Sequence, residues 1–496
     1  MVCSAAVAAI YRDWWSLAWF VVSAAVTAAT GLGTRHLFRA APEPGEREAL
    51  SIATAAWSAM TVFGGVPFIL AAHLTPDAVI ASYVPAGADY TSSSLLHFRD
   101  PLHAFFEAMS GWTSTGLTMA VNEASMPHAF LFYRSLTQWI GGLGIIVLAL
   151  TVIQQHGGVQ GLYLYQTEAR PTRIRPSMRE TARRVWRIYV AITGGVVLYL
   201  FAAMVILLPD YPVTAAIFDA INHAMTGMAT GGFSTQDDSI AGYGSYAIEV
   251  VHLLPMIMGA VALPVHYIAI RERRPSAYLN DVQNRTMVGL LVVGSSLVAW
   301  ALVGAPAIAD PTREGVFQFT SALTTTGWQT SEIGQWEAAA VLIVVVAMVL
   351  GGPAGSTVGA LKLLRVNFLA RGVWWQVTQV FYPSSAVPAF RIGDRTFRRE
   401  EMEAESGRAA LFTLMWVVGL FVSVILMSLT VDTSFSLADM IFESATAQGT
   451  VGLSSGITDP SMPTSVEAMF IFQMLFGRLE IVPVVVFVRT LVWPRR

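Results

Sequence analysis

The chain has 496 residues, of which 54% are hydrophobic and only 13% are charged, and its mean hydropathy is +0.56. Soluble domains carry about twice that charged fraction, so the composition excludes a soluble globular protein. The net charge of -3 says little by itself, whereas the single cysteine, Cys3, excludes an intrachain disulfide and a cysteine-rich metal site.

Apolar runs of the length that crosses a bilayer, about 20 residues, recur from one end of the chain to the other. They are 14–33, 50–73, 129–154, 186–208, 246–270, 287–309, 338–371, 409–430 and 466–493. The first run is too long and too aromatic for a cleavable signal, and it can direct insertion as the first transmembrane helix. Together the runs predict an all-α polytopic membrane protein.

The basic residues predict how the spans are oriented. All but five of the 30 Lys and Arg residues fall in 34–48, 168–188, 271–285, 362–408 and 489–496. Short loops rich in Lys and Arg stay on the cytoplasmic side. In the alternate loops only Arg99 and Arg313 are basic, so we expect those loops to face the outside.

Four glycine-bearing segments recur between the apolar runs, and each aligns on one central glycine. They are Thr113-Ser114-Thr115-Gly116, Ala229-Thr230-Gly231-Gly232, Thr324-Thr325-Thr326-Gly327 and Gly449-Thr450-Val451-Gly452. Each follows a short apolar segment of about ten residues, too short to span a membrane. These segments are 103–112, 219–228, 315–323 and 440–448.

Non-helical backbone at membrane depth is tolerated only where protein or a water-filled cavity covers it. The recurrence therefore predicts four membrane–pore-loop–membrane repeats, which enter from the outside around a pseudo-fourfold pore. Ordinary Gly/Thr turns between short helices are the alternative, and the common register of all four segments argues against it. The predicted organisation is an N-terminal helix with a cytoplasmic linker and then the four repeats, at 1–48, 49–170, 171–285, 286–400 and 401–496.

The glycine segments suit a dehydrated monovalent cation. Rings of backbone carbonyls replace the ion's water without a fixed countercharge that binds it too tightly, and glycine adopts the unusual backbone angles at low cost. Thr450-Val451-Gly452 matches the start of the TVGYG filter of potassium channels. The half-helices would direct partial negative charge at the cavity. We therefore expect K⁺ to bind the backbone carbonyls of the four segments, with no organic cofactor.

The run 338–371 is too long for one simple crossing. Pro353 and the surrounding glycines break a helix there, so a polar loop at 351–359 is expected to line the pore beneath the filter and to act as its gate. A packing break at a helix crossing is the alternative. The candidate gate residues of the loop are Gly351, Gly352, Gly355, Ser356, Thr357 and Gly359.

Arg478 lies inside the last apolar run, close to Glu480. An arginine at the centre of a membrane helix costs about 2.5–3.5 kcal/mol on insertion scales, so it needs water or an acceptor. Residues two apart do not face each other on a helix, and each must find another partner, with the pore or the broken loop nearest. We expect Arg478 below the filter, where its charge raises the barrier to cations; an anchor to neighbouring carbonyls is the alternative.

Several polar residues lie near the predicted filter. Glu123, Asp237 and Asp238 follow the first two glycine segments, either as acids that concentrate cations at the mouth or as ordinary solvated loop acids. His103, Asn222 and His223 lie near the half-helices, where we expect packing and hydrogen bonding rather than metal ligation.

Further motifs complete a pattern that resembles a known family. They are Phe132-Tyr133-Arg134 with Gln138–Gly142, Gly231–Thr235, Glu180–Ala182 with Trp186, Gly355–Thr357 through Lys362, and Met474–Ile481. In this order, together with the glycine segments, they resemble the TrkH/TrkG/KtrB superfamily of bacterial potassium uptake proteins, from about residue 50 to the end.

The resemblance implies potassium uptake across the inner membrane by the translocating subunit of a Trk/Ktr-type system, which is not an enzyme. It implies a homodimer with one pore per subunit, and a cytosolic RCK-type nucleotide-binding regulatory subunit similar to TrkA or KtrA. No nucleic-acid partner is expected. The family's filter glycines correspond to Gly116, Gly232, Gly327 and Gly452, its gating loop to 351–359 and its pore arginine to Arg478.

Three departures from the family pattern bear on these expectations. Ala360 replaces a glycine after the loop, and Trp328-Gln329 replaces phenylalanine followed by serine or threonine. One clear span precedes the first repeat, whereas TrkH-type proteins have two, and Met1–Ile10 is too short to be the second. A Na⁺-permeable or weakly selective cation channel, and a membrane receptor or enzyme, are the alternatives. Coupling to H⁺ or Na⁺ stays open.

Overall fold

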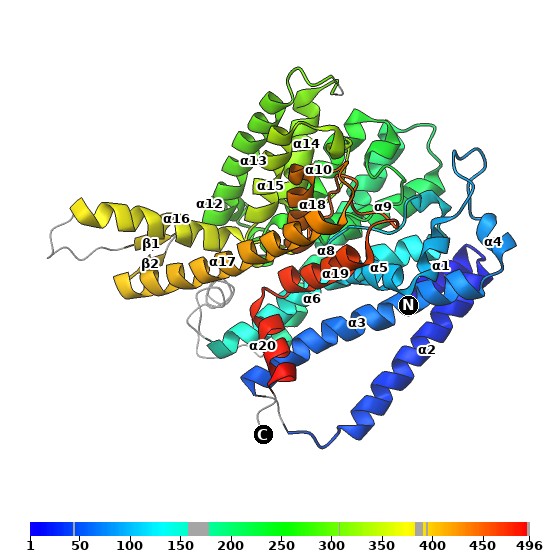
Figure 1. Cartoon of the computed structure of the whole chain (residues 1–496), viewed down its shortest axis with the longest axis horizontal. Helices are drawn as coiled ribbons and strands as arrows, with labels where there is room; N and C mark the ends of the chain where they lie inside the picture. The colour runs from blue at the N-terminus through cyan, green and yellow to red at the C-terminus, as the bar shows by residue number, and fades with distance from the viewer. Residues whose placement is uncertain (43–44, 157–177, 307, 382–389, 393–394, 494–496) are drawn as a thin grey trace.

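The computed structural model describes all residues except 43–44, 157–177, 307, 382–389, 393–394 and 494–496. Most of the described chain is helical, and long helices surround a group of shorter ones (Figure 1). The predicted boundary between the first two repeats, at 170 and 171, lies outside the described residues, as do the arginines of 168–188 that precede residue 178.

Each repeat contains an outer helix, a short pore helix and an inner helix. The outer helices are α3 (Glu46–Leu74), α8 (Met178–Leu207), α13 (Val282–Ala301) and α17 (Arg399–Thr430). The pore helices are α5 (Pro101–Thr113), α9 (Val213–Met228), α14 (Pro311–Leu323) and α18 (Leu437–Gly449). The inner helices are α6 (His128–His156) and the pairs α10 (Tyr246–Ala260) with α11 (Leu263–Arg271), α15 (Ala338–Leu350) with α16 (Leu363–Thr378), and α19 (Thr464–Arg478) with α20 (Val482–Val492).

Smaller elements complete the chain. Two helices, α1 (Val2–Ile10) and α2 (Trp14–Leu37), precede the repeats and pack together. The short helices are α4 (Asp77–Ala81), η1 (Ser94–Arg99), η2 (Glu123–Ser125), η3 (Ala241–Tyr243), α12 (Ala277–Asn280), η4 (Ile333–Gln335) and η5 (Gln379–Phe381). One antiparallel pair, β1 (Phe390–Ile392) and β2 (Arg395–Phe397), is the exception to the all-α prediction within the described part of the chain.

Three pore helices begin at residues that favour a helix start. Asp100 and Asp310 accept hydrogen bonds from first-turn N–H groups of α5 and α14, at 2.8 Å and 3.0 Å, and a proline follows each. Ser436 and Asp439 form a capping box at α18. α5, α14 and α18 are each 13 residues long and α9 is 16, so none spans a membrane alone. Their carbonyl ends lead directly into the glycine segments.

The repeats follow one another around a closed ring. The inner helix of each repeat packs against the pore helix of the next: α6 on α9, α10 on α14, α15 on α18, and α19 on α5. The last contact returns the fourth repeat to the first, so a single chain encloses its own centre. The predicted architecture of four repeats around a pseudo-fourfold axis is therefore confirmed.

Two of the predicted spans contain a bend in the structure. The runs 246–270 and 466–493 are predicted as single crossings, but each is two helices with a sharp bend, 101° between α10 and α11 and 118° between α19 and α20. Pro264 and Pro483 stand in the first turn of the second helix of each pair. Proline lacks an N–H and fixes φ, so it starts a helix more readily than it continues one. The break predicted inside 338–371 is present, between α15 and α16.

The described helices are those of a multi-pass membrane protein. Within the part of the chain that the structure describes, five helices are long and apolar enough to cross a membrane, and seven if each bent pair is one span. The sequence predicts nine apolar spans. The run 338–371 does not qualify, because its apolar first half, α15, has only 13 residues.

Candidate ion pathway

The four glycine segments share one backbone conformation. The residue two before each central glycine has a left-handed φ of about 50°, and the glycine itself also has a positive φ. The values are 53° for Ser114, 49° for Thr230, 50° for Thr325, 51° for Thr450, 97° for Gly116, 78° for Gly232, 85° for Gly327 and 99° for Gly452. A positive φ is unusual for threonine, which is β-branched, and such strain persists only where the surroundings hold it.

Hydrogen bonds to the pore helix hold each segment in the same way. The N–H of the residue before the central glycine donates to the carbonyl five residues earlier. These bonds are Thr115 to Ser110, Gly231 to Thr226, Thr326 to Ser321 and Val451 to Thr446, at 2.9, 2.8, 2.9 and 2.9 Å. The helix end and the glycine segment are therefore one rigid unit, repeated four times.

The central glycines and the carbonyls before them form a ring. A Cβ added to Gly116 would lie 2.2 Å from the carbonyl oxygen of Gly231 in the next repeat. The same contact joins Gly232 to Thr326 at 1.9 Å, Gly327 to Val451 at 2.1 Å, and Gly452 back to Thr115 at 2.3 Å. Only glycine fits at these positions, because the neighbour is backbone and cannot turn away. Four carbonyl oxygens, one from each repeat, thus converge around the axis.

Gln138 of α6 ties the first repeat to this ring. Its side-chain Nε2 donates to the carbonyl of Gly231 at 2.6 Å, and its Oε1 accepts from the N–H of Phe233 at 3.1 Å. The two bonds bracket Gly232. The sequence motif that contains Gln138 carried no assigned role, since the contact spans almost a hundred residues and depends on the packing of α6 against α9.

The loop between α15 and α16 lies directly beneath the filter. Thr357 meets the hydroxyl of Thr230 at 3.1 Å, and the N–H of Gly359 donates to Thr325 Oγ1 at 3.1 Å. A Cβ on Gly359 would lie 2.1 Å from Thr450 Oγ1. The loop therefore contacts the second, third and fourth glycine segments at the same level, the residue two before the central glycine.

Arg478 links this loop to the first glycine segment. Its Nη1 donates to the carbonyl of Thr357 at 2.7 Å, and its Nη2 donates to Ser114 Oγ and to the carbonyl of Gly141 at 3.4 and 3.3 Å. The side chain is 2% exposed. Glu480 pairs with Arg365 instead, so the prediction that these two residues find separate partners is confirmed. Arg478 is anchored to carbonyls and also lies at the level of the loop.

Two non-glycine residues of the loop have left-handed backbones. Ala360 has a φ of 59° and Lys362 a φ of 70°, and the ammonium group of Lys362 donates to the carbonyl of Val358. A left-handed conformation costs an L-residue about 1–2 kcal/mol. Ala360, where the family pattern has glycine, therefore adds local strain to the loop in this conformation.

The third glycine segment accommodates its unusual residues. Trp328 is fully buried and its ring contacts the rings of His223 and His252 edge-on, with centroids 5.7 and 5.2 Å apart. Gln329 donates to the carbonyl of Ser454 at 3.1 Å and so joins the third repeat to the fourth. Trp328 thus packs against the second repeat, whereas Gln329 lines the cavity above the filter, where it bonds to the fourth repeat.

A cavity of about 210 Å³ opens above the filter, and its lining includes all four central glycines. Asp237 and Asp459 line it with Glu123, whereas Asp238 is an exposed residue outside the lining. Asp237 also accepts from the N–H of Ala124 at 2.7 Å. Burial raises the pKa of Glu123 to about 8, against the opposing effect of Arg134. Glu123 is therefore largely protonated at neutral pH and contributes little negative charge to the cavity.

The sequence did not point to Asp459, because this residue reaches the cavity from a loop that only the ring of repeats brings there. The polar residues near the pore helices behave as expected. His103 contacts the carbonyl of His97 at 2.9 Å, Asn222 donates to that of Phe218 at 2.7 Å, and His223 contacts Ser234 Oγ at 3.2 Å. The described residues contain no group of His, Cys, Asp and Glu that could hold a metal ion.

Four re-entrant pore helices, a ring of carbonyls and an acidic cavity above it define a membrane protein of the pore-loop class that transports cations. The sequence model of the TrkH family, described as a cation transport protein, matches residues 78–493. The chain belongs to this family.

Relatives and a solved structure agree with this assignment. The chain is 30% identical to the "Trk system potassium uptake protein TrkH" of Halomonas elongata, over 96% of this chain and 92% of the relative. Identity to the protein of the same name from Escherichia coli is also 30%, over 99% and 95%. The crystal structure of the potassium transporter TrkH from Vibrio parahaemolyticus superposes with a TM-score of 0.76 at 25% identity, and covers 99% of this chain and 96% of that one.

Proposed function

We propose that the protein carries K⁺ into the cell through the four-repeat filter. The closed ring of contacts between each central glycine and the preceding carbonyl of the next repeat carries this proposal. Carbonyl rings replace the hydration shell of K⁺, and all four segments have the same backbone. The K⁺-binding residues are Thr113–Gly116, Ala229–Gly232, Thr324–Gly327 and Gly449–Gly452.

The distribution of basic residues indicates the direction of transport, and the relatives indicate the membrane and the partners. Basic segments mark the cytoplasmic side, so the acidic cavity with Asp237 and Asp459 faces outward and gathers cations. The protein resides in the bacterial inner membrane as a homodimer. A cytosolic RCK-type nucleotide-binding subunit controls it, in keeping with the name "Trk system" of its relatives.

The loop 351–359 and Arg478 form the gate. The loop touches the second, third and fourth glycine segments from below, and Arg478 joins it to the first, so this conformation obstructs the path of an ion that leaves the filter. Opening requires the loop to move, and Ala360, whose left-handed backbone is strained, favours that release.

The function is tested by expression in a bacterium that lacks its own potassium uptake systems. We expect growth on low K⁺ to be restored and K⁺ influx to exceed Na⁺ influx at equal concentrations. Equal influx of the two ions would favour the weakly selective channel, and no influx of either ion would favour a receptor or an enzyme.

Removal of the charge of Arg478 is expected to increase K⁺ influx. Arg478→Gln keeps an amide donor for the carbonyl of Thr357 but no longer repels a cation below the filter. We expect influx to rise about tenfold, which corresponds to a barrier lower by about 1.4 kcal/mol. Arg478→Lys keeps the charge and serves as the control. Unchanged influx through folded Arg478→Gln protein would leave the residue as an anchor only.

A further inference from the structure

A buried polar side chain stands at the same place on every pore helix, nine residues before the central glycine. The four residues are Glu107, His223, Gln318 and Glu443, with exposures of 1, 0, 0 and 0%. Two are glutamates, one is a histidine and one is a glutamine, so no single charge or residue type is common to all four. They share a position at least one turn before the carbonyl end of the pore helix, on the face that contacts the segment after the central glycine.

Each of these side chains contacts the backbone N–H three residues after the central glycine. Glu107 accepts from Met119 at 2.9 Å, and Glu443 accepts from Ser455 at 2.7 Å. His223 Nε2 accepts from Thr235 at 3.4 Å. Gln318, with its amide oriented so that both atoms are satisfied, accepts from Thr330 at 2.6 Å.

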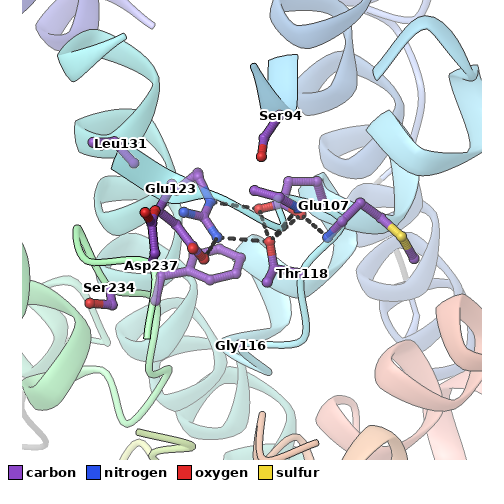
Figure 2. A network of polar contacts seen from close by, with 12 residues as sticks. Ser94, Glu107, Gly116, Thr118, Glu123, Leu131, Ser234 and Asp237 are labelled. Atoms are coloured by element: carbon purple, nitrogen blue, oxygen red, sulfur yellow. Dashed lines mark hydrogen bonds and ion pairs between the residues drawn. The ribbon is translucent and has the colours of Figure 1, made fainter. Parts of the chain in front are cut away.

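We call these four side chains the anchors of the filter. In three repeats the anchor makes a second contact. The hydroxyl two residues after the central glycine donates to, or contacts, the same side chain. The pairs are Thr118 with Glu107 at 3.0 Å, Ser234 with His223 at 3.2 Å, and Ser454 with Glu443 at 2.5 Å. Figure 2 shows the first pair, with Glu107 directed at Thr118.

We propose that these four side chains are positioning residues that fix the width of the carbonyl ring and thereby its preference for K⁺ over Na⁺. The proposal rests on the proposed function. Each glycine segment is held on both sides. Below, the N–H of the residue before the central glycine donates to a carbonyl of the pore helix. Above, the N–H of the residue three after the glycine donates to the buried polar side chain. A ring clamped on both sides resists contraction around a smaller ion, which is one source of selectivity in carbonyl filters.

Glu443 is the most informative anchor to change. Within the described part of the chain its carboxylate meets hydroxyl and N–H donors, from Ser454, Ser455 and Thr458, whereas Glu107 is also paired with Arg134. Glu443→Gln keeps an acceptor for the N–H of Ser455. Glu443→Leu has a comparable size and no acceptor, and it leaves a buried donor unpaired.

The test measures the ratio of K⁺ to Na⁺ influx in the low-K⁺ expression strain. We expect Glu443→Leu to lower this ratio about tenfold, as befits a lost buried hydrogen bond, and Glu443→Gln to keep it within about twofold of the unchanged protein. Asp439→Asn, in the first turn of the same helix and part of its capping box, is the control for loss of a carboxylate. A merely structural role would lower the influx of both ions equally and leave the ratio unchanged, which would overturn the proposal.

A second variant and a measurement on the unchanged protein complete the test. If Glu443→Leu does not accumulate as folded protein, Gln318→Met removes the acceptor of the third anchor at similar volume, and the same loss of preference is expected. An unchanged ratio there would equally overturn the proposal. Absence of K⁺ influx through the unchanged protein would contradict the proposed function itself, and is thus distinct from a failure of the anchors.

Discussion

Gly232→Ser is expected to abolish K⁺ influx while the protein still inserts and accumulates. A Cβ at this position would lie 1.9 Å from the carbonyl oxygen of Thr326, well inside van der Waals contact, and the backbone φ of 78° disfavours any L-side chain. The obstacle is backbone of the next repeat, held from below by the bond from Thr326 to Ser321. The ring must widen or distort, and the carbonyls no longer replace the hydration shell of the ion.

Gly244→Ser is the matched control. Gly244 belongs to the same repeat and also has a left-handed φ, 58°, but a Cβ there meets nothing within 4 Å. The two variants share the backbone penalty and differ only in the contact with the ring. We expect Gly244→Ser to retain influx close to that of the unchanged protein. Appreciable K⁺ influx through Gly232→Ser would contradict the assignment of this ring as the filter.

The repeat could be read from the sequence because its signal is local. A glycine, its small neighbours and a preceding apolar segment lie within about 15 residues of one another, and the same pattern recurs four times. The break near Pro353 was visible for the same reason, since several glycines surround it. Pro264 and Pro483 break their helices as effectively, but no comparable group of glycines surrounds either of them.

The anchors of the filter could not be predicted from a local sequence motif. Glu107, His223, Gln318 and Glu443 occupy equivalent positions, yet they include three different residue types and so give no motif common to all four repeats. In each, a side-chain atom accepts a hydrogen bond from the N–H three residues after the central glycine. This contact becomes apparent only once the path of the chain after the pore helix is known. Contacts between repeats, such as that of Gln138 with Gly231, depend on tertiary packing in the same way.

Arg134→Gln is expected to destabilise the protein severely. Arg134 is 1% exposed; its Nε donates to Glu107 at 2.6 Å, its Nη2 donates to Thr118 at 2.8 Å, and its guanidinium lies 4.2 Å above the ring of Phe233. Its removal leaves the carboxylate of Glu107 buried without its cation. Loss of one partner of a buried ion pair costs about 3–5 kcal/mol. The measurement is the thermal unfolding midpoint of the detergent-solubilised protein, together with its yield from membranes.

A second substitution separates the lost pair from lost packing. Glu107→Gln removes the charge that Arg134→Gln leaves unpaired, and it still offers an oxygen to the N–H of Met119. We therefore expect the double variant to recover much of the stability, because a buried pair replaced on both sides is often close to neutral. Equal instability of the single and double variants would assign the effect to the contact with Phe233. A single variant as stable as the unchanged protein would show that Glu107 holds the N–H of Met119 without help from Arg134.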